Sequence, residues 1–285
     1  RPAAVEDRMV KAGKLSMVAT PIGHLGDFSF RGVEVLKAAA VIACEDTRHT
    51  RRLLAHYGIE APLTSIHAHT RAETIERLLD RIEAGEDVAY VTDAGTPALS
   101  DPGGILAARA HARGLTVVPI PGPAAVMAAL AGAGFPADRF VFLGFLPKRG
   151  TARAELLERI AAEVFTTVCY EAPGRTAVLL ADLAERCGAE RPAAVARELT
   201  KLYEEIRRGT LGELAAYYGQ HGARGEVTIV IGGRGEEPPP AVLSAADQAV
   251  AIEELRGTGT PAAVAKELSK RLGISRQDAY RLLTR

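Results

Sequence analysis

The 285-residue sequence contains no Trp, only three Cys and few aromatic residues. Cys44, Cys169 and Cys187 are widely spaced and form no C-x-x-C pair, which argues against a disulfide framework and a structural zinc site. No apolar run is long enough to span a bilayer, and the N-terminus lacks the apolar segment of a signal peptide. We therefore expect a cytoplasmic protein that does not associate with a membrane.

An excess of either charge is also missing, because 35 basic residues balance 35 acidic ones. This balance excludes the chain-wide positive field that by itself indicates a nucleic-acid-binding protein, so any nucleic-acid contact has to use local patches. The sequence has no G-x-S-x-G or H-E-x-x-H motif, and no G-x-G-x-x-G follows the first expected strand. We therefore expect neither a metal site nor a nicotinamide cofactor.

Apolar strands that end in polar turns recur along the first part of the chain. Residues 15–20 run into a glycine-rich turn, residues 40–44 into Glu45–His49, and residues 88–91 into Asp93–Asp101. Helices with apolar residues at helical spacing follow, and this alternation predicts an α/β domain with a mainly parallel sheet. Ligands bind beyond the carboxyl ends of such strands, so the polar turns predict a ligand site.

The polar turn after residues 88–91 allows two interpretations. Asp93, Gly95 and Thr96 are expected to face a ligand, whereas Ser100 and Asp101 are residue types that also cap a following helix. All of these residue types are also common in ordinary turns for backbone reasons alone. From the residues themselves, a site and a structural turn remain equally open.

Two local predictions concern the ends of secondary-structure elements. Thr70 and Glu73 have the spacing of a capping box, so they predict the start of a helix. Residues 202–211 predict either a pair of strands with a turn at Gly209 or a short helix.

The order of the expected elements divides the chain into five segments. In the last of them, two short helices with helix-turn-helix spacing carry six basic residues between positions 266 and 285. Such a domain either binds phosphates or forms a helical cap with a solvated basic face. The first residue is not Met, which indicates a trimmed chain. The predicted segments are a flexible lead-in at 1–14, an α/β domain at 15–125, a second α/β domain at 126–233, a Pro-rich linker at 234–242 and a small helical domain at 243–285.

Seven motifs between Leu15 and Gly233 together resemble the small-subunit ribosomal RNA methyltransferases of the tetrapyrrole methylase superfamily. CEDTRHT and YEAPGR separate this resemblance from relatives that act on tetrapyrroles. The resemblance implies two α/β domains with S-adenosylmethionine in a cleft between them, no metal and a homodimer. The motifs, in chain order, are ATPIGHLGD, VIACEDTRHTRRLL, VTDAGTPALSDPG, PIPGPAA, FLGFLPKRG, YEAPGR and VARELTKLYEEIRRGTLGEL.

The activity that this resemblance implies is 2'-O-methylation of a cytidine ribose in the decoding region of 16S rRNA. The implied partner is the rRNA or the assembled small ribosomal subunit. Two alternatives are an enzyme of the same fold that methylates a tetrapyrrole or another small molecule, and a non-catalytic nucleic-acid-binding protein. Methyl transfer from a sulfonium is an in-line displacement, so the main task of such an enzyme is to align donor carbon and acceptor oxygen.

The resemblance also assigns residues to the cofactor. Asp93 is expected to accept hydrogen bonds from the cationic amino-acid end of the cofactor, and Gly95 to let the backbone approach it. Two positions depart from the family pattern: His24 replaces an Asn, which changes one cofactor hydrogen bond, and Gly174 replaces a His, so no imidazole base is assigned there. The assigned cofactor residues are Pro21, Gly23, His24, Asp93, Gly95, Thr96, Ala124, Ala125, Tyr170 and Glu226.

A ribose hydroxyl is a poor nucleophile, so a proton acceptor or a cation is expected beside it. Glu171 and Asp46 are assigned to catalysis, with Glu45 and His49 as further candidates. A structural ion pair at a helix start is the alternative role for Glu45 and Arg48. The cations assigned to RNA phosphates are Arg48, Lys148, Arg149 and Arg175.

Overall fold

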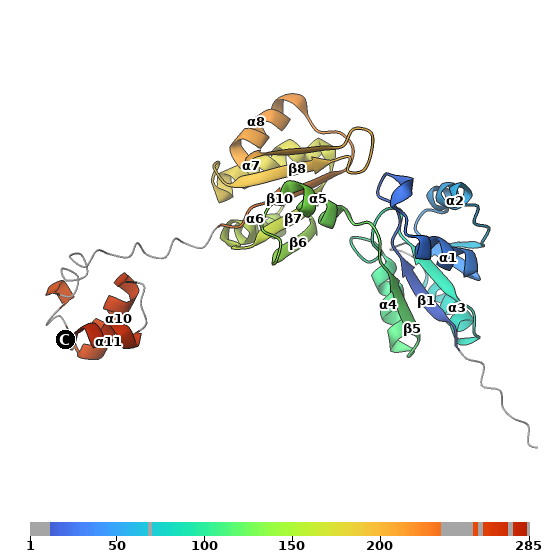
Figure 1. Ribbon diagram of the computed structural model, residues 1–285, viewed down its shortest axis with the longest axis horizontal. Helices are drawn as coiled ribbons and strands as arrows, with labels where there is room; N and C mark the ends of the chain where they lie inside the picture. The colour runs from blue at the N-terminus through green and yellow to red at the C-terminus, as the bar shows by residue number, and fades with distance from the viewer. Residues whose placement is uncertain (1–11, 68–69, 235–252, 256–258, 273–275, 284–285) are drawn as a thin grey trace, which may run out of the picture. The chain divides into compact units, whose positions relative to one another are not determined.

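In the computed structural model, the chain separates into two compact units, Arg1–Gly232 and Gly233–Arg285. The structure describes residues 12–67, 70–234, 253–255, 259–272 and 276–283. The predicted lead-in at 1–14 and linker at 234–242 therefore lie largely outside the described residues. The first unit contains two five-stranded sheets (Figure 1).

The strands of the first sheet are all parallel, in the order β3-β2-β4-β1-β5. Helices α3 and α4 cover one face, and α1 and α2 cover the other. Burial on both faces explains the continuous apolar runs of β2 and β4. The carboxyl ends of these strands therefore share one edge. The elements are β1 (Lys14–Val18), α1 (Phe30–Ala38), β2 (Val41–Cys44), α2 (Thr47–His56), β3 (Leu63–Ser65), α3 (Ala72–Glu83), β4 (Val88–Val91), α4 (Gly103–Ala112) and β5 (Thr116–Ile120).

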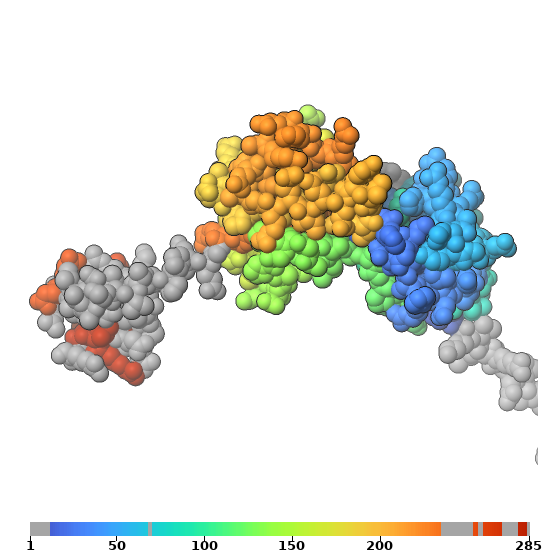
Figure 2. Space-filling view, turned by 45° about the horizontal axis from the view of Figure 1, so that its top comes forward, coloured from blue at the N-terminus to red at the C-terminus, as the bar shows by residue number. Residues whose placement is uncertain are grey.

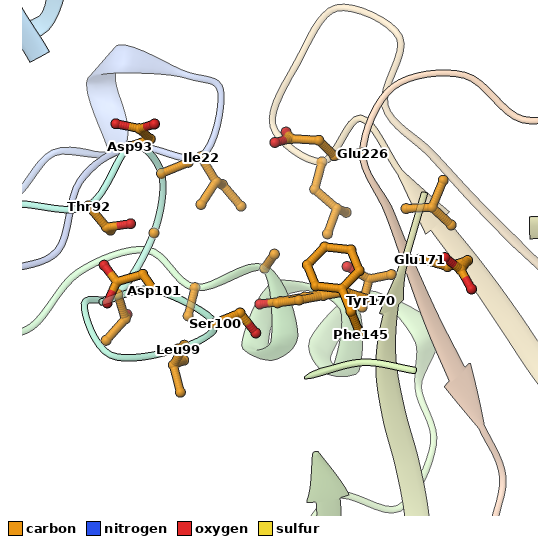
Figure 3. Close-up of a pocket in the computed structure, with 18 of the residues that line it drawn as sticks. Ile22, Thr92, Asp93, Leu99, Ser100, Asp101, Phe145, Tyr170, Glu171 and Glu226 are labelled. Atoms are coloured by element: carbon orange, nitrogen blue, oxygen red, sulfur yellow. The ribbon is translucent and has the colours of Figure 1, made fainter. Parts of the chain in front are cut away.

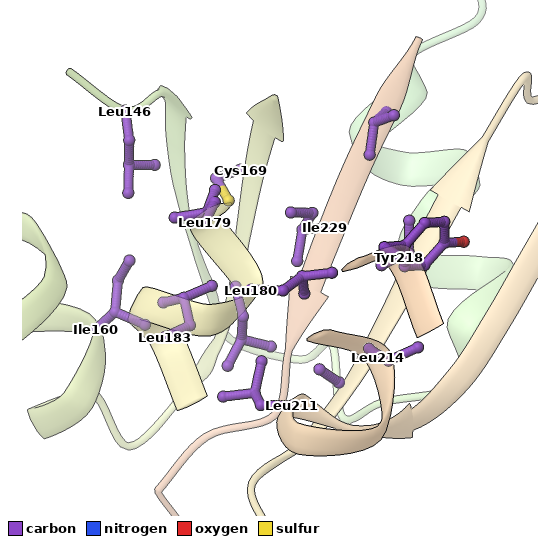
Figure 4. Close-up of a cluster of buried hydrophobic side chains, with 14 of the residues drawn as sticks. Leu146, Ile160, Cys169, Leu179, Leu180, Leu183, Leu211, Leu214, Tyr218 and Ile229 are labelled. Carbon is purple, nitrogen blue, oxygen red and sulfur yellow. The ribbon is translucent and has the colours of Figure 1, made fainter. Parts of the chain in front are cut away.

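The second sheet has the order β6-β7-β10-β8-β9, in which only β6 and β7 are parallel neighbours. Helices α6, α7 and α8 pack on one face around Leu179, Leu180 and Leu183 (Figure 4), and α5 packs on the other face. The elements are α5 (Ala125–Ala133), β6 (Phe140–Phe145), α6 (Thr151–Ala162), β7 (Thr166–Glu171), α7 (Thr176–Cys187), β8 (Pro192–Arg197), β9 (Glu205–Thr210), α8 (Leu211–His221) and β10 (Val227–Ile231).

The second unit contains the two short helices expected near the C-terminus, α10 (Pro261–Leu272) and α11 (Arg276–Leu283). They share a small buried cluster of Ala265, Leu268 and Ala279. In the part of the chain that the structure describes, no helix is both long and apolar enough to cross a membrane.

Both local predictions about element ends differ from the structure. Helix α3 begins after Arg71, which makes no side-chain cap, and the Thr70 hydroxyl instead accepts a hydrogen bond from the His67 backbone. The Thr70 side chain thus stabilises the loop before the helix. A capping box is formed by Thr210 at the start of α8. Gly209 lies inside β9 and not at a turn, because β9 continues directly to that cap.

A buried arginine ties the second sheet to the end of α6. Arg191 donates from Nε to the Gly232 carbonyl at 2.6 Å and from its terminal nitrogens to carbonyls of Ile160, Ala161 and Glu163. The last carbonyls of a helix have no partner within the helix, and a cation there is also favoured by the helix dipole. Arg191 therefore satisfies groups that would otherwise be buried without partners.

Replacing this arginine should destabilise the first unit. We expect Arg191→Met to lower the free energy of unfolding by about 3 kcal/mol, because several buried carbonyls lose their donors. Urea unfolding followed by circular dichroism measures this loss. Arg224→Met, at an exposed position, is the control and should change little. Equal losses in the two variants would contradict this role.

Candidate active site

A cleft of about 430 Å³ lies between the carboxyl edge of the first sheet and the second sheet (Figure 3). Its walls are the residues that follow β2 and β4, the start of α5, the ends of β6 and β7, and residues 199 and 225–228. Cavities of this size hold ligands of cofactor dimensions. The polar turns after β2 and β4 therefore meet at one cavity, whereas the turn after β1 contributes only Ile22.

The lining of the cleft is acidic. Among its described lining residues there is no Lys, Arg or His. Such a site favours a ligand that carries positive charge and disfavours phosphate. The carboxylates that line it are Glu45, Asp93, Asp101, Glu171 and Glu226.

Asp101 and Glu226 have partners that fix them in place. Asp101 accepts hydrogen bonds from the Gly103 backbone at 2.9 Å and from the Tyr90 hydroxyl at 3.1 Å. Asp101 thus stabilises the start of α4, in line with the helix-start role that was one of its two predicted interpretations. It also lines the cleft. Glu226, which has an exposed side chain, forms an ion pair with Lys201 at 2.7 Å.

The predicted cofactor residues after β4 all line the cleft. Asp93 accepts a hydrogen bond from the Asp46 backbone at 3.0 Å, and the Thr96 hydroxyl donates to the Pro123 carbonyl at 3.0 Å. Gly95 has a φ of +84°, a left-handed conformation that favours glycine. Gly95 is buried, and its backbone N–H and C=O both bond Thr20, at 3.0 and 2.9 Å, so this glycine joins the turn after β4 to the turn after β1 at the wall of the cleft.

Positive φ values at other residue types are confined to two loops. Among the described residues, only Ala98, Ser100, Glu198 and Thr200 combine a side chain with a positive φ, between 50° and 71°. The first two lie in the loop after β4, and the other two lie in the loop after β8, whose Leu199 lines the cleft. Backbone strain of this kind concentrates at functional sites, where surrounding contacts maintain it.

The glycine-rich turn after β1 lies mostly outside the lining of the cleft. Pro21, Gly23 and His24 do not line the cleft, whereas Ile22 does. A Cβ at Gly23 would lie 2.5 Å from Lys201 Cγ and 2.7 Å from the Thr200 hydroxyl oxygen. The His24 backbone also donates to that hydroxyl, at 3.0 Å. The turn therefore fastens the first sheet to the loop after β8.

His24 also organises its own turn. Its Nδ1 accepts a hydrogen bond from the Gly26 backbone at 3.1 Å and caps the short helix η1 (Leu25–Asp27). The His24 side chain therefore stabilises its own turn through this hydrogen bond.

The remaining predicted cofactor residues, Ala124, Ala125, Tyr170 and Glu226, line the cleft from the side of the second sheet. Burial raises the pKa of Tyr170, and a hydrogen bond with the Val126 backbone opposes this rise. The Tyr170 hydroxyl is therefore neutral near pH 7.

Sequence reasoning missed the apolar part of the lining. Leu99 and Phe145 are large apolar side chains that remain exposed in the structure, and the Phe145 ring lies 5.4 Å from that of Tyr170. The signals that could have indicated them are a large apolar residue within a polar turn, for Leu99, and one at the end of a strand, for Phe145. Ile22 and Leu199 complete this apolar part of the cleft.

Both carboxylates assigned to catalysis have bonded partners, although the buried Oε2 of Glu171 has none among the described residues. Glu171 has a fully buried side chain, and its Oε1 accepts from Arg175 Nε at 2.7 Å. Asp46 does not line the cleft but caps α2, accepting from the Arg48 backbone at 2.8 Å. Hydrogen bonds from Arg48 lower the pKa of Asp46 to about 2, so Asp46 binds a proton poorly at neutral pH.

The cations assigned to RNA differ in their availability. Lys148 and Arg149 are exposed in the loop before α6. Arg175 is held by Glu171, and Arg48 pairs with Asp46 at 3.1 Å although its side chain is 85% exposed. The helix-start ion pair considered for Glu45 and Arg48 is thus formed by Asp46 instead.

For Glu45, the sequence left two roles open, a catalytic carboxylate and a structural ion pair. Glu45 follows β2 directly, lines the cleft and has no side-chain hydrogen bond or ion pair among the described residues. Burial raises the pKa of Glu45, and the carboxylates of Asp93 and Asp101 raise it further. Glu45 is therefore a better proton acceptor than Asp46.

The sequence matches the tetrapyrrole (corrin/porphyrin) methylases over residues 14–215. The chain belongs to the tetrapyrrole methylase family. A curated relative, ribosomal RNA small subunit methyltransferase I of Xylella fastidiosa (strain Temecula1), is 47% identical over 231 residues, which are 80% of this chain and 85% of the relative. The Synechocystis protein of the same name is 42% identical over 271 residues, 95% of this chain and 97% of the relative.

A solved structure supports the same fold for this methylase. The uroporphyrin-III C-methyl transferase from Thermus thermophilus complexed with S-adenyl homocysteine is 20% identical, with a TM-score of 0.56 over 78% of this chain and 98% of that one. The predicted superfamily and the predicted α/β fold with two sheets are confirmed.

The contact at Gly23 should control ligand binding without any direct contact to the ligand. We expect Gly23→Ala to weaken binding of S-adenosyl homocysteine by about tenfold, because the new methyl group overpacks the contact with the loop after β8. Isothermal titration calorimetry measures the affinity. Gly219→Ala, where nothing lies within 4 Å of the added Cβ, is the matched control. Unchanged affinity in Gly23→Ala would show that the contact does not shape the cleft.

Proposed function

We propose that this methylase transfers a methyl group from S-adenosylmethionine to a ribose 2'-oxygen of small-subunit rRNA, at a cytidine in the decoding region. The proposal includes a cytoplasmic location, a homodimer, and rRNA or the assembled small subunit as the partner. One observation carries it: a cleft lined by carboxylates and by no cation, in a chain whose relatives of 42–47% identity bear the name ribosomal RNA small subunit methyltransferase I.

The predictions of a methyltransferase and of S-adenosylmethionine as its cofactor are confirmed by the family. The cleft of this chain fits that cofactor by its chemistry. A sulfonium and an ammonium group carry positive charge, and the uncompensated carboxylates of Glu45 and Asp93 supply the opposite charge. The apolar side chains of Ile22 and Leu199 suit the uncharged parts of the molecule.

We assign the binding of this cofactor to residues on both sides of the cleft. Asp93, Gly95 and Thr96 would hold it from the first sheet, and Ala125 and Tyr170 from the second. When bound, the cofactor supplies an activated methyl group. Tyr170 and the neighbouring apolar side chains exclude water, which strengthens every electrostatic interaction inside the cleft.

We assign the proton transfer to Glu45. As the ribose oxygen bonds to the methyl carbon and the carbon–sulfur bond breaks, the hydroxyl proton has to leave, and Glu45 is an unpaired carboxylate at the cleft that can accept it. The surrounding burial and negative charge make its carboxylate more basic than an ordinary glutamate. Asp46 and Glu171, the residues first assigned to this step, then act by fixing Arg48 and Arg175.

Small ribosomal subunits from cells that lack this enzyme test the proposed function. Incubation with cofactor labelled in the methyl group should place label in the rRNA, and mapping of ribose methylation should locate it at a decoding-region cytidine. Label in a porphyrinoid with none in rRNA would favour a small-molecule methyltransferase. No label in rRNA from either free RNA or assembled subunits would contradict the proposal.

Substitution of Glu45 should affect the chemical step more than binding. We expect Glu45→Gln to lower kcat by 10²- to 10⁴-fold, the usual contribution of a general base, and to weaken cofactor binding by a much smaller factor, because Glu45 supplies part of the negative charge opposite the cofactor. Since the pKa of Glu45 is raised above 4.5, the unaltered enzyme should lose activity as the pH falls through that raised value. Single-turnover rates against pH measure both effects.

The same measurement on Asp46→Asn separates the two carboxylates. If Glu45 is the base, Asp46→Asn keeps the acidic limb of the pH profile, that is, the loss of activity as the pH falls through the raised pKa of Glu45. Loss of the limb in Asp46→Asn, with its retention in Glu45→Gln, would reverse the assignment.

A further inference from the structure

The acidic cleft raises the question of where the phosphates of an RNA substrate are bound. This inference rests on the proposed function. Carboxylates at the cleft repel a phosphate backbone, so only the target nucleotide can enter, and the flanking phosphates need cations outside. Of the four cations predicted for this role, Arg48 and Arg175 are already paired with carboxylates.

Helix α2, which begins two residues after the cleft residue Glu45, presents a basic stripe. Residues at spacing i, i+3 and i+4 share one face of a helix, so Arg48, Arg51, Arg52 and Ala55 form a continuous stripe. All four are exposed, whereas the opposite face of the helix is buried against the first sheet. In Figure 2 the light-blue segment that includes α2 lies at the molecular surface. The buried residues of α2 are Thr50, Leu53 and Leu54.

Two of these arginines have no anion of their own. Neither Arg51 nor Arg52 makes a hydrogen bond or ion pair with any described residue, and α2 itself contains no Asp or Glu. In α4, by contrast, Arg109 and Arg113 both pair with Glu76 of α3. Like charges at these spacings destabilise a helix, so a stripe without intramolecular partners is suited to an external polyanion.

The position of α2 connects this stripe to the chemistry. The helix begins two residues after Glu45, and at 1.5 Å per residue Arg51 and Arg52 lie within about 9 Å of its start along the axis. A shallow hollow beside the stripe is lined by Arg51, Ala55 and residues 58–63. The small side chain of Ala55 leaves room for a strand to approach the helix.

We propose that the basic stripe of α2, formed by Arg48, Arg51 and Arg52, binds the phosphates of the rRNA strand next to the methylated nucleotide. Binding there delivers the adjacent ribose to the cleft beside Glu45 while the phosphates remain outside its negative field. Arg48, which Asp46 orients, lies nearest the cleft, and Arg51 and Arg52 extend the contact along the strand.

Charge reversal on the stripe tests this proposal. Arg51→Glu with Arg52→Glu should weaken binding to small ribosomal subunits from cells lacking the enzyme by at least about tenfold. Filter binding at several salt concentrations should give a slope of log K against log salt that is less negative by about 1.4, the value for two lost contacts to single-stranded RNA. The affinity for S-adenosyl homocysteine should stay within about twofold of the original, because neither residue lines the cleft.

A matched control makes the same change in net charge as the stripe variant, at two cations that lie outside the stripe. Lys37→Glu with Arg159→Glu alters two exposed cations in the last turns of α1 and α6, away from the carboxyl edge of the first sheet. This control should bind subunits at least several-fold more tightly than the stripe variant, and Arg51→Lys with Arg52→Lys should restore most of the affinity.

Three results distinguish failure of this proposal from failure of the proposed function. Equal subunit affinity of the stripe and control variants would overturn the stripe as an RNA site. If the stripe variant lost as much affinity for S-adenosyl homocysteine as for subunits, the RNA-site proposal would also be overturned. Arg51 and Arg52 would then be needed for the folded structure and not for RNA binding. Absence of methyl transfer to rRNA by the unaltered protein would instead overturn the proposed function.

Discussion

The turn at Gly23 lies against residues of the loop after β8, at a distance that leaves no room for a side chain. Ile22 beside it packs in the same buried cluster as Leu199 and the inner face of α5. This contact holds the carboxyl edge of the first sheet opposite the second sheet, and the cleft lies between them. The strained residue Thr200 is part of this contact, so the contact also maintains its conformation.

Charge is separated by sign over a short distance around this cleft. Inside, Glu45 and Asp93 carry negative charge without a paired cation, which favours a cationic methyl donor. Outside, Arg51 and Arg52 of α2 have no paired acid among the described residues, which favours a phosphate backbone. Asp46 stands at the junction, because it caps the helix and orients Arg48 while its backbone bonds Asp93. One short segment after β2 thus contributes to both predicted binding functions.

Much of the fold and part of the site were predictable from local sequence. Apolar strands followed by polar turns predicted a parallel sheet with a candidate ligand edge at Asp93 and Gly95, and the residue type of Asp101 was compatible with its bond to the backbone at the start of α4. The choice between Glu45 and Asp46 was not predictable, because it depends on which of two adjacent carboxylates caps α2. The cap leaves the other one free at the cleft.

Contacts between distant segments were also beyond sequence reasoning. Gly23 was assigned to the cofactor from its own motif, whereas in the structure it contacts Thr200, a residue 177 positions away in the loop between β8 and β9. Glu171 lies one residue after Tyr170 in β7, and successive strand residues point to opposite faces. Its carboxylate therefore meets Arg175, a pairing that the motif alone did not indicate.

Hydrogen–deuterium exchange with and without S-adenosyl homocysteine tests the central claim most directly, namely that the ligand binds between the two sheets. The account predicts slower exchange on both sides of the cleft together, at residues 92–101, at 124–126 and at 225–228. Slower exchange confined to one sheet, or located away from these residues, would contradict it.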